Sequence, residues 1–156
     1  MIEKLDLVVD AVGTLHSKLV LLIAAGQAGK TVLLQTFAAH RGVLPLKVGA
    51  VLGARLAALP QRQRKLQCPA ILRELADQHA SGDLLLLDNV ELLFDQSLQL
   101  DPLDLLKRLA VARRVVAVWP GELRGDIKTG RLTYADLGHP EHQDYGLAGL
   151  VPFEVQ

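Results

Sequence analysis

Three short runs of apolar residues constrain the fold of this 156-residue chain most strongly. They are Leu19–Ile23, residues 84–87 and residues 115–118, and each run is apolar at every position. A strand of this kind is typical of a parallel sheet that has helices on both faces. Because helical patterns lie between the runs, the sequence predicts an α/β fold. We expect a three-layer αβα sandwich around a mostly parallel sheet of about five strands.

Helical spacing opens the chain and separates the apolar runs. The first 17 residues are predicted to form an amphipathic helix, because apolar residues recur there at steps of three and four: Ile2, Leu5, Val9, Val12 and Leu15. Another helix is expected at residues 31–39, and one is expected to stop at Pro60. Pro69 is predicted to lie in the first turn of the next helix, and Asp101-Pro102 is a cap followed by the proline that favours a helix start.

The remaining segments give weaker signals. Residues 43–48 are a candidate second strand, although Pro45 is unusual within a strand. Residues 128–131 are typical of a hairpin turn inside a C-terminal region of residues 121–156, and residues 146–156 give no prediction. Since the chain has no repeat and no obvious linker, we expect residues 1–156 to form a single domain.

Composition limits the kind of protein. The chain has 17 basic and 17 acidic residues, and the zero formal charge excludes a generally basic, histone-like binder. The lone Cys68 fits a reducing compartment. The longest apolar run is much shorter than the roughly 20 residues that span a bilayer, and the N-terminus has no signal-peptide pattern. We therefore expect a soluble, cytoplasmic protein with no membrane partner.

The charges are unevenly distributed along the chain. Nine Lys and Arg residues and no acid occur in residues 11–73, whereas fourteen acids and seven basic residues occur in residues 74–156. This asymmetry indicates a basic face and an acidic face. Three interpretations stay open: charges scattered over a solvated surface, a head-to-tail contact between subunits, and a patch for nucleic acid or an acidic partner.

Residues 24–31, with the sequence AAGQAGKT, match the Walker A motif with Ala at its first position. The small residues allow backbone N–H groups to surround a phosphate, and the following helix directs its positive end at the anion. Lys30 is expected to reach the β- and γ-phosphates of ATP, and the Thr31 hydroxyl to hold Mg²⁺. The candidate nucleotide-binding residues are Gly26, Gln27, Ala28, Gly29, Lys30, Thr31 and Val32.

The apolar run at residues 84–87 ends at Asp88, which gives it the form of a Walker B motif. A carboxylate at the carboxyl end of a buried strand is expected to hold Mg²⁺ together with Thr31. Asn89 follows, where many ATPases of the additional-strand P-loop class have a glutamate that polarises water. Glu91 and Glu122 are the candidates to replace that glutamate, or they are solvated surface acids. The sequence therefore supports ATP binding more strongly than ATP hydrolysis.

Other nucleotide enzymes fit the sequence poorly. The guanine-reading motif of GTPases is absent, residues 43–48 lack the acid of small-molecule kinases, and too little chain follows the last predicted core strand for an AAA+ lid. A minimal AAA+-like core without a helical lid remains. Arg113 and Arg114 are candidates for a finger given to a neighbouring subunit, or they balance a helix dipole. Residues 62–65 are a basic run that touches phosphate or is solvated, and a zinc site at His139 and His142 is not expected.

Several segments together resemble the BrxF family, the small P-loop proteins of type 3 bacteriophage-exclusion (BREX) systems. The resemblance covers about residues 17–145 and rests on these pieces: 29–31, 59–64, 87–95, 100–103, 119–121, 132–135 and 138–141. It implies a cytoplasmic component of antiphage defence. It also implies work beside a DNA methyltransferase, an alkaline-phosphatase-like protein and a larger ATPase.

Three functions stay open on the sequence. The first is an ATPase that works as a homo-oligomer, with each site completed by a neighbour's arginine. The second is a nucleotide-gated interaction module that binds ATP or ADP with little or no hydrolysis. The third is an accessory subunit that contacts DNA through the basic first half of the chain.

Overall fold

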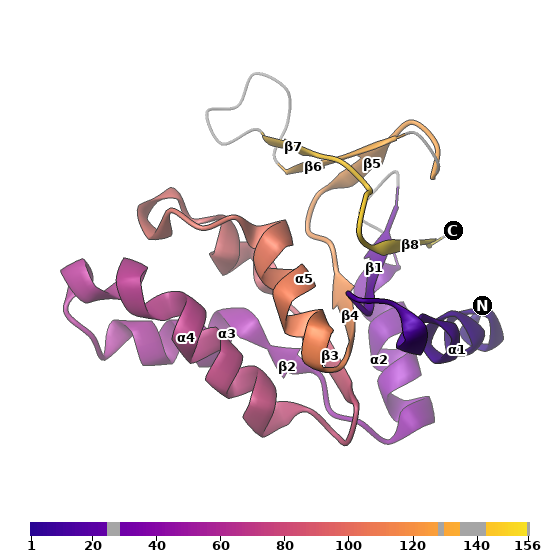
Figure 1. Cartoon of the computed structure of the whole chain (residues 1–156), viewed down its shortest axis with the longest axis horizontal. Coiled ribbons are helices and arrows are strands. Elements are labelled where there is room, and N and C mark those ends of the chain that lie inside the picture. The colour runs from indigo at the N-terminus through magenta and orange to yellow at the C-terminus, as the bar shows by residue number, and fades with distance from the viewer. Residues whose placement is uncertain (25–28, 128–129, 135–142, 156) are drawn as a thin grey trace.

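The computed structural model describes residues 1–24, 29–127, 130–134 and 143–155, and it is an α/β structure (Figure 1). Five strands form one parallel sheet in the order β2-β3-β4-β1-β8, and three more form a small antiparallel sheet in the order β5-β6-β7. The helices are α1 (Ile2–Ala11), α2 (Lys30–Arg41), α3 (Val48–Ala57), α4 (Gln61–His79) and α5 (Pro102–Ala112), with short 3-10 turns η1 (Val12–Thr14), η2 (Val90–Phe94) and η3 (Gln96–Leu98). The strands are β1 (Leu19–Ile23), β2 (Leu46–Lys47), β3 (Leu84–Asp88), β4 (Arg114–Val118), β5 (Glu122–Arg124), β6 (Arg131–Tyr134), β7 (Gln143–Tyr145) and β8 (Val151–Glu154).

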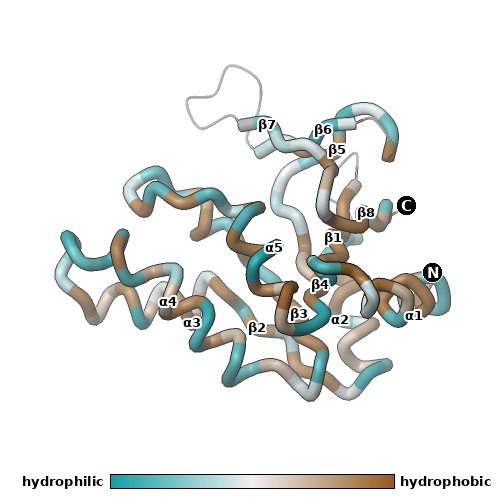
Figure 2. The backbone as a smooth tube through the Cα atoms, in the orientation of Figure 1, coloured by the Kyte–Doolittle hydropathy of each residue, from teal (hydrophilic) through white to brown (hydrophobic). Residues whose placement is uncertain are grey.

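Alternate residues of each central strand face opposite layers of helices. In β1, Leu19, Leu21 and Ile23 pack into the core shared with α3, α4 and α5, whereas Val20 and Leu22 pack into the core shared with α1 and α2. β3 and β4 divide in the same way, and all five β1 residues are fully buried. The coloured tube of Figure 2 shows these strands as apolar. This arrangement confirms the expected α/β fold with a mostly parallel sheet between helical layers.

Local sequence signals set several element ends, among them the predicted start of α5. The Asp101 carboxylate accepts a hydrogen bond from the Asp104 backbone N–H at 3.1 Å, and Pro102 is the first residue of α5. Gly42 ends α2 in the left-handed region with a φ of 67°, which a glycine adopts without steric cost.

Three predicted boundaries are wrong. The helix expected over the first 17 residues is shorter, because α1 ends at Ala11 and a 3-10 turn follows at Val12–Thr14, where Gly13 weakens the α-helix. The candidate strand at residues 43–48 shortens to the two residues of β2, because Pro45 has no N–H to donate and Val48 already begins α3. Pro69 lies inside α4 rather than in a first turn, because the helix begins at Gln61, directly after Pro60. The buried side chains of α4 that follow, among them Ile71, Leu72 and Leu75, pack in the larger core and offset the cost of an internal proline.

The small sheet stands above the carboxyl ends of the parallel strands (Figure 1). Residues 124 and 131 pair across β5 and β6, as the hairpin prediction requires, while residues 128–129 of the expected turn lie outside the described residues. The ring of Phe94 stacks on Tyr134 with centroids 4.1 Å apart and meets Trp119 edge-on at 5.3 Å. The aromatic contacts therefore join η2 and the end of β4 to the small sheet.

Among the described residues, no helix is both long and apolar enough to cross a membrane.

The internal proline of α4 generates a stability prediction. The Pro69→Ala substitution restores a backbone N–H donor and removes the pyrrolidine ring that clashes with the preceding helical turn. In host helices this change stabilises the helix by about 3 kcal/mol. The more flexible unfolded chain returns about 1 kcal/mol of that gain. We expect urea denaturation to show a net stabilisation of about 2 kcal/mol.

The matched control is Pro60→Ala, since Pro60 precedes α4 with a φ of −57° that suits the ring. This variant is expected to gain no stability. A Pro69→Ala protein that unfolds at the same or a lower urea concentration than the wild type would contradict the account of α4.

Candidate functional site

The candidate site lies at the carboxyl ends of β1 and β4. The chain leaves β1 through α2 toward β2 at one edge of the sheet, and it leaves β4 toward β8 at the other edge. In open α/β sheets, ligands bind at such a reversal, in the crevice outside the carboxyl ends of the strands. The topology therefore marks the segments after β1 and β4 as the place to look for a site.

Lys30 occupies this place as the first residue of α2. Its side chain is 2% exposed, and its Nζ donates hydrogen bonds to the carbonyl oxygens of Trp119 at 2.7 Å and Gly121 at 2.8 Å. Both acceptors belong to the segment that follows β4. Gly29 precedes Lys30 with a φ of 87°, a conformation that favours glycine, and thereby allows the chain to turn sharply into the helix.

Burial and nearby carboxylates act on the charge of Lys30 in opposite directions. Burial lowers the pKa of the Lys30 amine, while the charges of Glu122 and Glu91 raise it, and the net direction is downward. A buried ammonium without partners would be strongly unfavourable. The two carbonyls and the two acids thus offset part of the cost of burying this positive charge.

Thr31 and Asp88 meet beside Lys30, as the motifs predict. The Thr31 hydroxyl lies 3.4 Å from Asp88 Oδ1, and the same oxygen accepts the Asn89 backbone N–H at 2.9 Å. Asp88 is the last residue of β3 and is 5% exposed. A hydroxyl and a carboxylate are oxygen ligands suited to Mg²⁺, which takes few protein ligands and keeps several waters or phosphate oxygens.

The candidate residues for water activation surround the same site. Asn89 adopts the left-handed region with a φ of 55°, where asparagine is tolerated, and its carbonyl accepts the Gly49 N–H at 2.9 Å. Glu91 is exposed in η2, whereas Glu122 is half-buried at the start of β5. Both act electrostatically on Lys30, so the fold brings the two predicted acids to the lysine from different elements.

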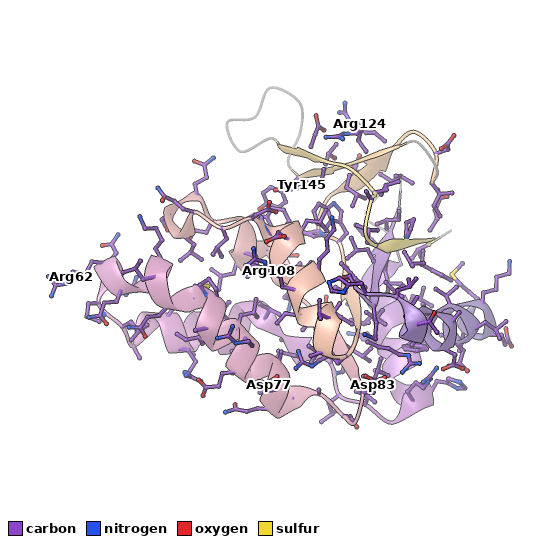
Figure 3. All side chains as sticks on the ribbon, in the orientation of Figure 1. Arg62, Asp77, Asp83, Arg108, Arg124 and Tyr145 are labelled. Carbon is purple, nitrogen blue, oxygen red and sulfur yellow. The ribbon has the colours of Figure 1, made fainter. Side chains whose placement is uncertain are left out.

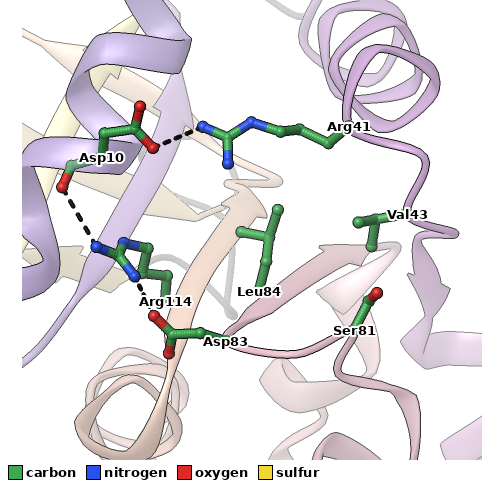
Figure 4. A pocket seen from close by; sticks show the side chains of 7 residues that line it. All are labelled: Asp10, Arg41, Val43, Ser81, Asp83, Leu84 and Arg114. Atoms are coloured by element: carbon green, nitrogen blue, oxygen red, sulfur yellow. Dashed lines mark hydrogen bonds and ion pairs between the residues drawn. The ribbon is translucent and has the colours of Figure 1, made fainter.

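Arg113 and Arg114 do not join these residues. They lie at the amino end of β4, whereas the Lys30 site lies at the carboxyl ends of the strands. There Arg113 pairs with Asp77 and Arg114 pairs with Asp83. Arg114 also donates to the backbone carbonyls of Val9 and Asp10 beside a pocket of about 320 Å³ (Figure 4). Both guanidinium groups therefore tie elements of their own chain together.

Several predicted positions cannot be compared with the structure. Gly26, Gln27, Ala28 and the pair His139 and His142 lie outside the described residues. Val32 is described, and its side chain points into solvent with 64% exposure. No group of three or more His, Cys, Asp or Glu residues in the described ranges has an arrangement that could hold a metal ion.

Sequence reasoning missed the acceptors of Lys30. Trp119 and Gly121 contribute backbone carbonyls, which leave no signature in residue types. Nothing in the sequence indicated that Val155, which follows β8, lies against Gly29. A Cβ added at Gly29 would come 3.3 Å from Val155 Cγ1. The only sequence feature that marked this segment was the Trp119-Pro120-Gly121 tripeptide.

Comparison with known proteins finds no matching family model, no matching curated protein and no matching solved structure.

The packing of Gly121 yields a prediction about the site. A Cβ at this position would lie 1.5 Å from the Thr133 carbonyl oxygen, which already accepts the Trp119 indole N–H at 3.0 Å. Gly121→Ala must therefore push β6 away from the end of β4. We expect a loss of stability of about 3 kcal/mol, at the upper end of overpacking effects, measured by thermal or urea unfolding.

Gly53→Ala is the matched control, because its Cβ would meet Leu92 at an ordinary contact distance of 3.8 Å. As a substitution inside α3, it is expected to stabilise by about 0.5–1 kcal/mol. If Gly121→Ala were as stable as the wild type, the close approach of β6 to Gly121 would be disproved.

Proposed function

We propose that this protein is a P-loop nucleotide-binding protein that binds ATP with Mg²⁺. The observation that carries the proposal is the buried Lys30 at the amino end of α2, held beside the Thr31 and Asp88 pair at the reversal of the sheet. A buried amine, a helix N-terminus and a carboxylate at a strand end are what a triphosphate and its metal require. The hydroxyl and carboxylate would hold the metal, which neutralises phosphate charge when bound.

The hydrogen bonds of Lys30 suggest how the site would respond to ATP. Its amine now rests on two neutral carbonyls at 2.7 and 2.8 Å. Hydrogen bonds from an ammonium to phosphate oxygens are charge-assisted at both ends and stronger than those to carbonyls. We infer that phosphate oxygens take the amine from the segment of Trp119 and Gly121, which then loses a fixed partner.

The sheet order supports the assignment to the additional-strand class of P-loop ATPases. β4 lies between β1, which leads to Lys30, and β3, which ends at Asp88. Since the chain also offers no lid among the described elements, the proposal is for a minimal AAA+-like core.

The proposed cellular role is that of a BrxF-like component of a cytoplasmic antiphage (BREX) system. Of the segments that resemble this family, residues 29–31, 87–95 and 119–121 contribute directly to the Lys30 site or its surroundings. The proposed partners are the DNA methyltransferase, the alkaline-phosphatase-like protein and the larger ATPase that accompany that family. Matching residues that gather at one site support a common function better than matching residues scattered over the surface.

Hydrolysis is proposed as the activity of an oligomer. Asn89 cannot accept a proton, and Arg113 and Arg114 lie at the amino end of β4, away from the Lys30 site of their own chain. A transition-state arginine would then come from a neighbouring copy, as in other ATPases completed in trans. The second candidate, nucleotide-gated binding with little turnover, is favoured by Asn89 and by the lack of a lid among the described elements.

The single tryptophan makes nucleotide binding directly measurable. Trp119 is the only tryptophan in the chain, it is fully buried, and its carbonyl accepts Lys30. We expect Mg²⁺ and ATP to change its fluorescence and to protect the fold against unfolding, by about 2.7 kcal/mol at a concentration of 100 Kd. Lys30→Met is expected to remove both effects.

Lys18→Met is the matched control. Lys18 also donates to a backbone carbonyl, that of Val111 at 3.0 Å, but it lies at the amino end of β1, away from the candidate site. It should leave the nucleotide response unchanged. A wild-type protein whose fluorescence and stability do not respond to ATP or ADP would refute the proposed function.

The two acids near Lys30 give a test of hydrolysis. Glu122 acts more strongly on the Lys30 pKa than Glu91 and is the more buried of the two. We expect Glu122→Gln to slow phosphate release by about 10²–10⁴-fold while ATP binding persists, and Glu91→Gln to have the smaller effect. Turnover per subunit is expected to rise with protein concentration.

Turnover that stays constant on dilution to the monomer would contradict the shared site. If the wild type binds ATP but releases no phosphate at any concentration, even with partner proteins and DNA, the binding-module function replaces the ATPase.

A further inference from the structure

Three cationic side chains gather at the amino end of α4. Arg62, Arg64 and Lys65 line a hollow of about 360 Å³ together with Gln61, Ser97 and Leu98. This lining contains no acidic side chain. Arg62 extends from the outer end of α4, away from the body of the molecule (Figure 3).

Two of the three cations are held in place without being neutralised. The Nε of Arg64 donates to the carbonyl of Leu56 in the last turn of α3 at 2.9 Å and to that of Leu59 just beyond the helix at 3.2 Å. Lys65 Nζ donates to the neutral Gln99 side chain at 3.1 Å. The terminal nitrogens of Arg64 and all of Arg62 have no protein partner within the described part of the chain.

Arginines elsewhere in the described residues are mostly paired with acids. Ion pairs neutralise the side chains of Arg41, Arg55, Arg108, Arg113 and Arg114. The acid on the neighbouring loop, Asp95, directs Oδ1 to the backbone and hydroxyl of Ser97 at 2.9 and 2.8 Å rather than to a cation. The hollow at α4 therefore gathers three cations that form no ion pair with a carboxylate among the described residues.

We propose that this hollow binds the phosphate groups of a nucleic-acid backbone. Arg and Lys side chains are the main phosphate ligands in such complexes, and the side-chain amide of Gln61 adds a neutral donor. The positive end of the 19-residue helix α4 points the same way. No aromatic ring lines the hollow, so base stacking is not expected there.

This surface is independent of the proposed nucleotide site. Its lining shares no residue with the Lys30 site, and its cations come from α4 rather than from the loops after β1 and β4. Binding of nucleic acid is therefore expected to survive Lys30→Met, so that failure of one proposal leaves the other untouched.

The test is fluorescence anisotropy of a labelled DNA duplex titrated with the full chain at several NaCl concentrations. Each neutralised phosphate contributes about −0.9 to the slope of log K against log salt, so three contacts predict a slope of about −2.7. The double variant Arg62→Gln/Lys65→Gln is expected to reduce this slope by about 1.8 and to weaken binding by about 10- to 100-fold at 50 mM salt. Circular dichroism would verify that the variant is folded.

Arg73→Gln is the matched control, because Arg73 is exposed on the same helix but outside the hollow. It should leave the affinity nearly unchanged. Inorganic phosphate at equal ionic strength is expected to release the duplex no better than NaCl.

Four results would overturn the proposal. One is the absence of DNA binding by the wild type at low salt, and another is an equal loss in Arg73→Gln. The third is preferential release by inorganic phosphate, which would assign the hollow to a free anion. If sedimentation showed that the double variant dissociates an oligomer while DNA binding is absent, the cations would belong to a contact between copies.

Discussion

The buried ammonium group of Lys30 determines how the functional edge of the sheet is built. A charge that is 2% exposed needs acceptors of its own, and the chain supplies the carbonyls of Trp119 and Gly121. These two bonds fix the segment that leaves β4 directly over the amino end of α2. The small antiparallel sheet begins one residue later at Glu122, so its position depends on the same lysine.

The lysine is also linked to the acidic side of the site through aromatic packing. The indole N–H of Trp119 binds the Thr133 carbonyl in β6, and its ring meets Phe94 at the end of η2 and Tyr145 in β7. η2 follows Asp88 and Asn89 and contains Glu91, while β5 begins with Glu122. In the proposed function, Lys30 would release the two carbonyls and bind phosphate. The resulting shift of the Trp119 segment would be passed to Glu91, Glu122 and the small sheet through these existing contacts.

The sequence predicted those parts of the structure that depend on the type of side chain at each position. Runs that are apolar on both faces identified β1, β3 and β4, and the Lys30, Thr31 and Asp88 motifs predicted residues that the fold does bring together. β8 escaped prediction because it contains Pro152 and pairs only with β1 at the sheet edge, where a proline is tolerated. The acceptors of Lys30 escaped because backbone carbonyls are present at every residue. Pro69 misled because tertiary packing outweighs local helix preference in α4.

A crystal structure of the full chain with Mg²⁺ and a non-hydrolysable ATP analogue tests the central claim most directly. The account predicts that Lys30 Nζ leaves the Trp119 and Gly121 carbonyls for phosphate oxygens, with the metal beside Thr31 and Asp88. A structure in which Lys30 keeps both carbonyls while the analogue is bound elsewhere, or is not bound at saturating concentration, would contradict it.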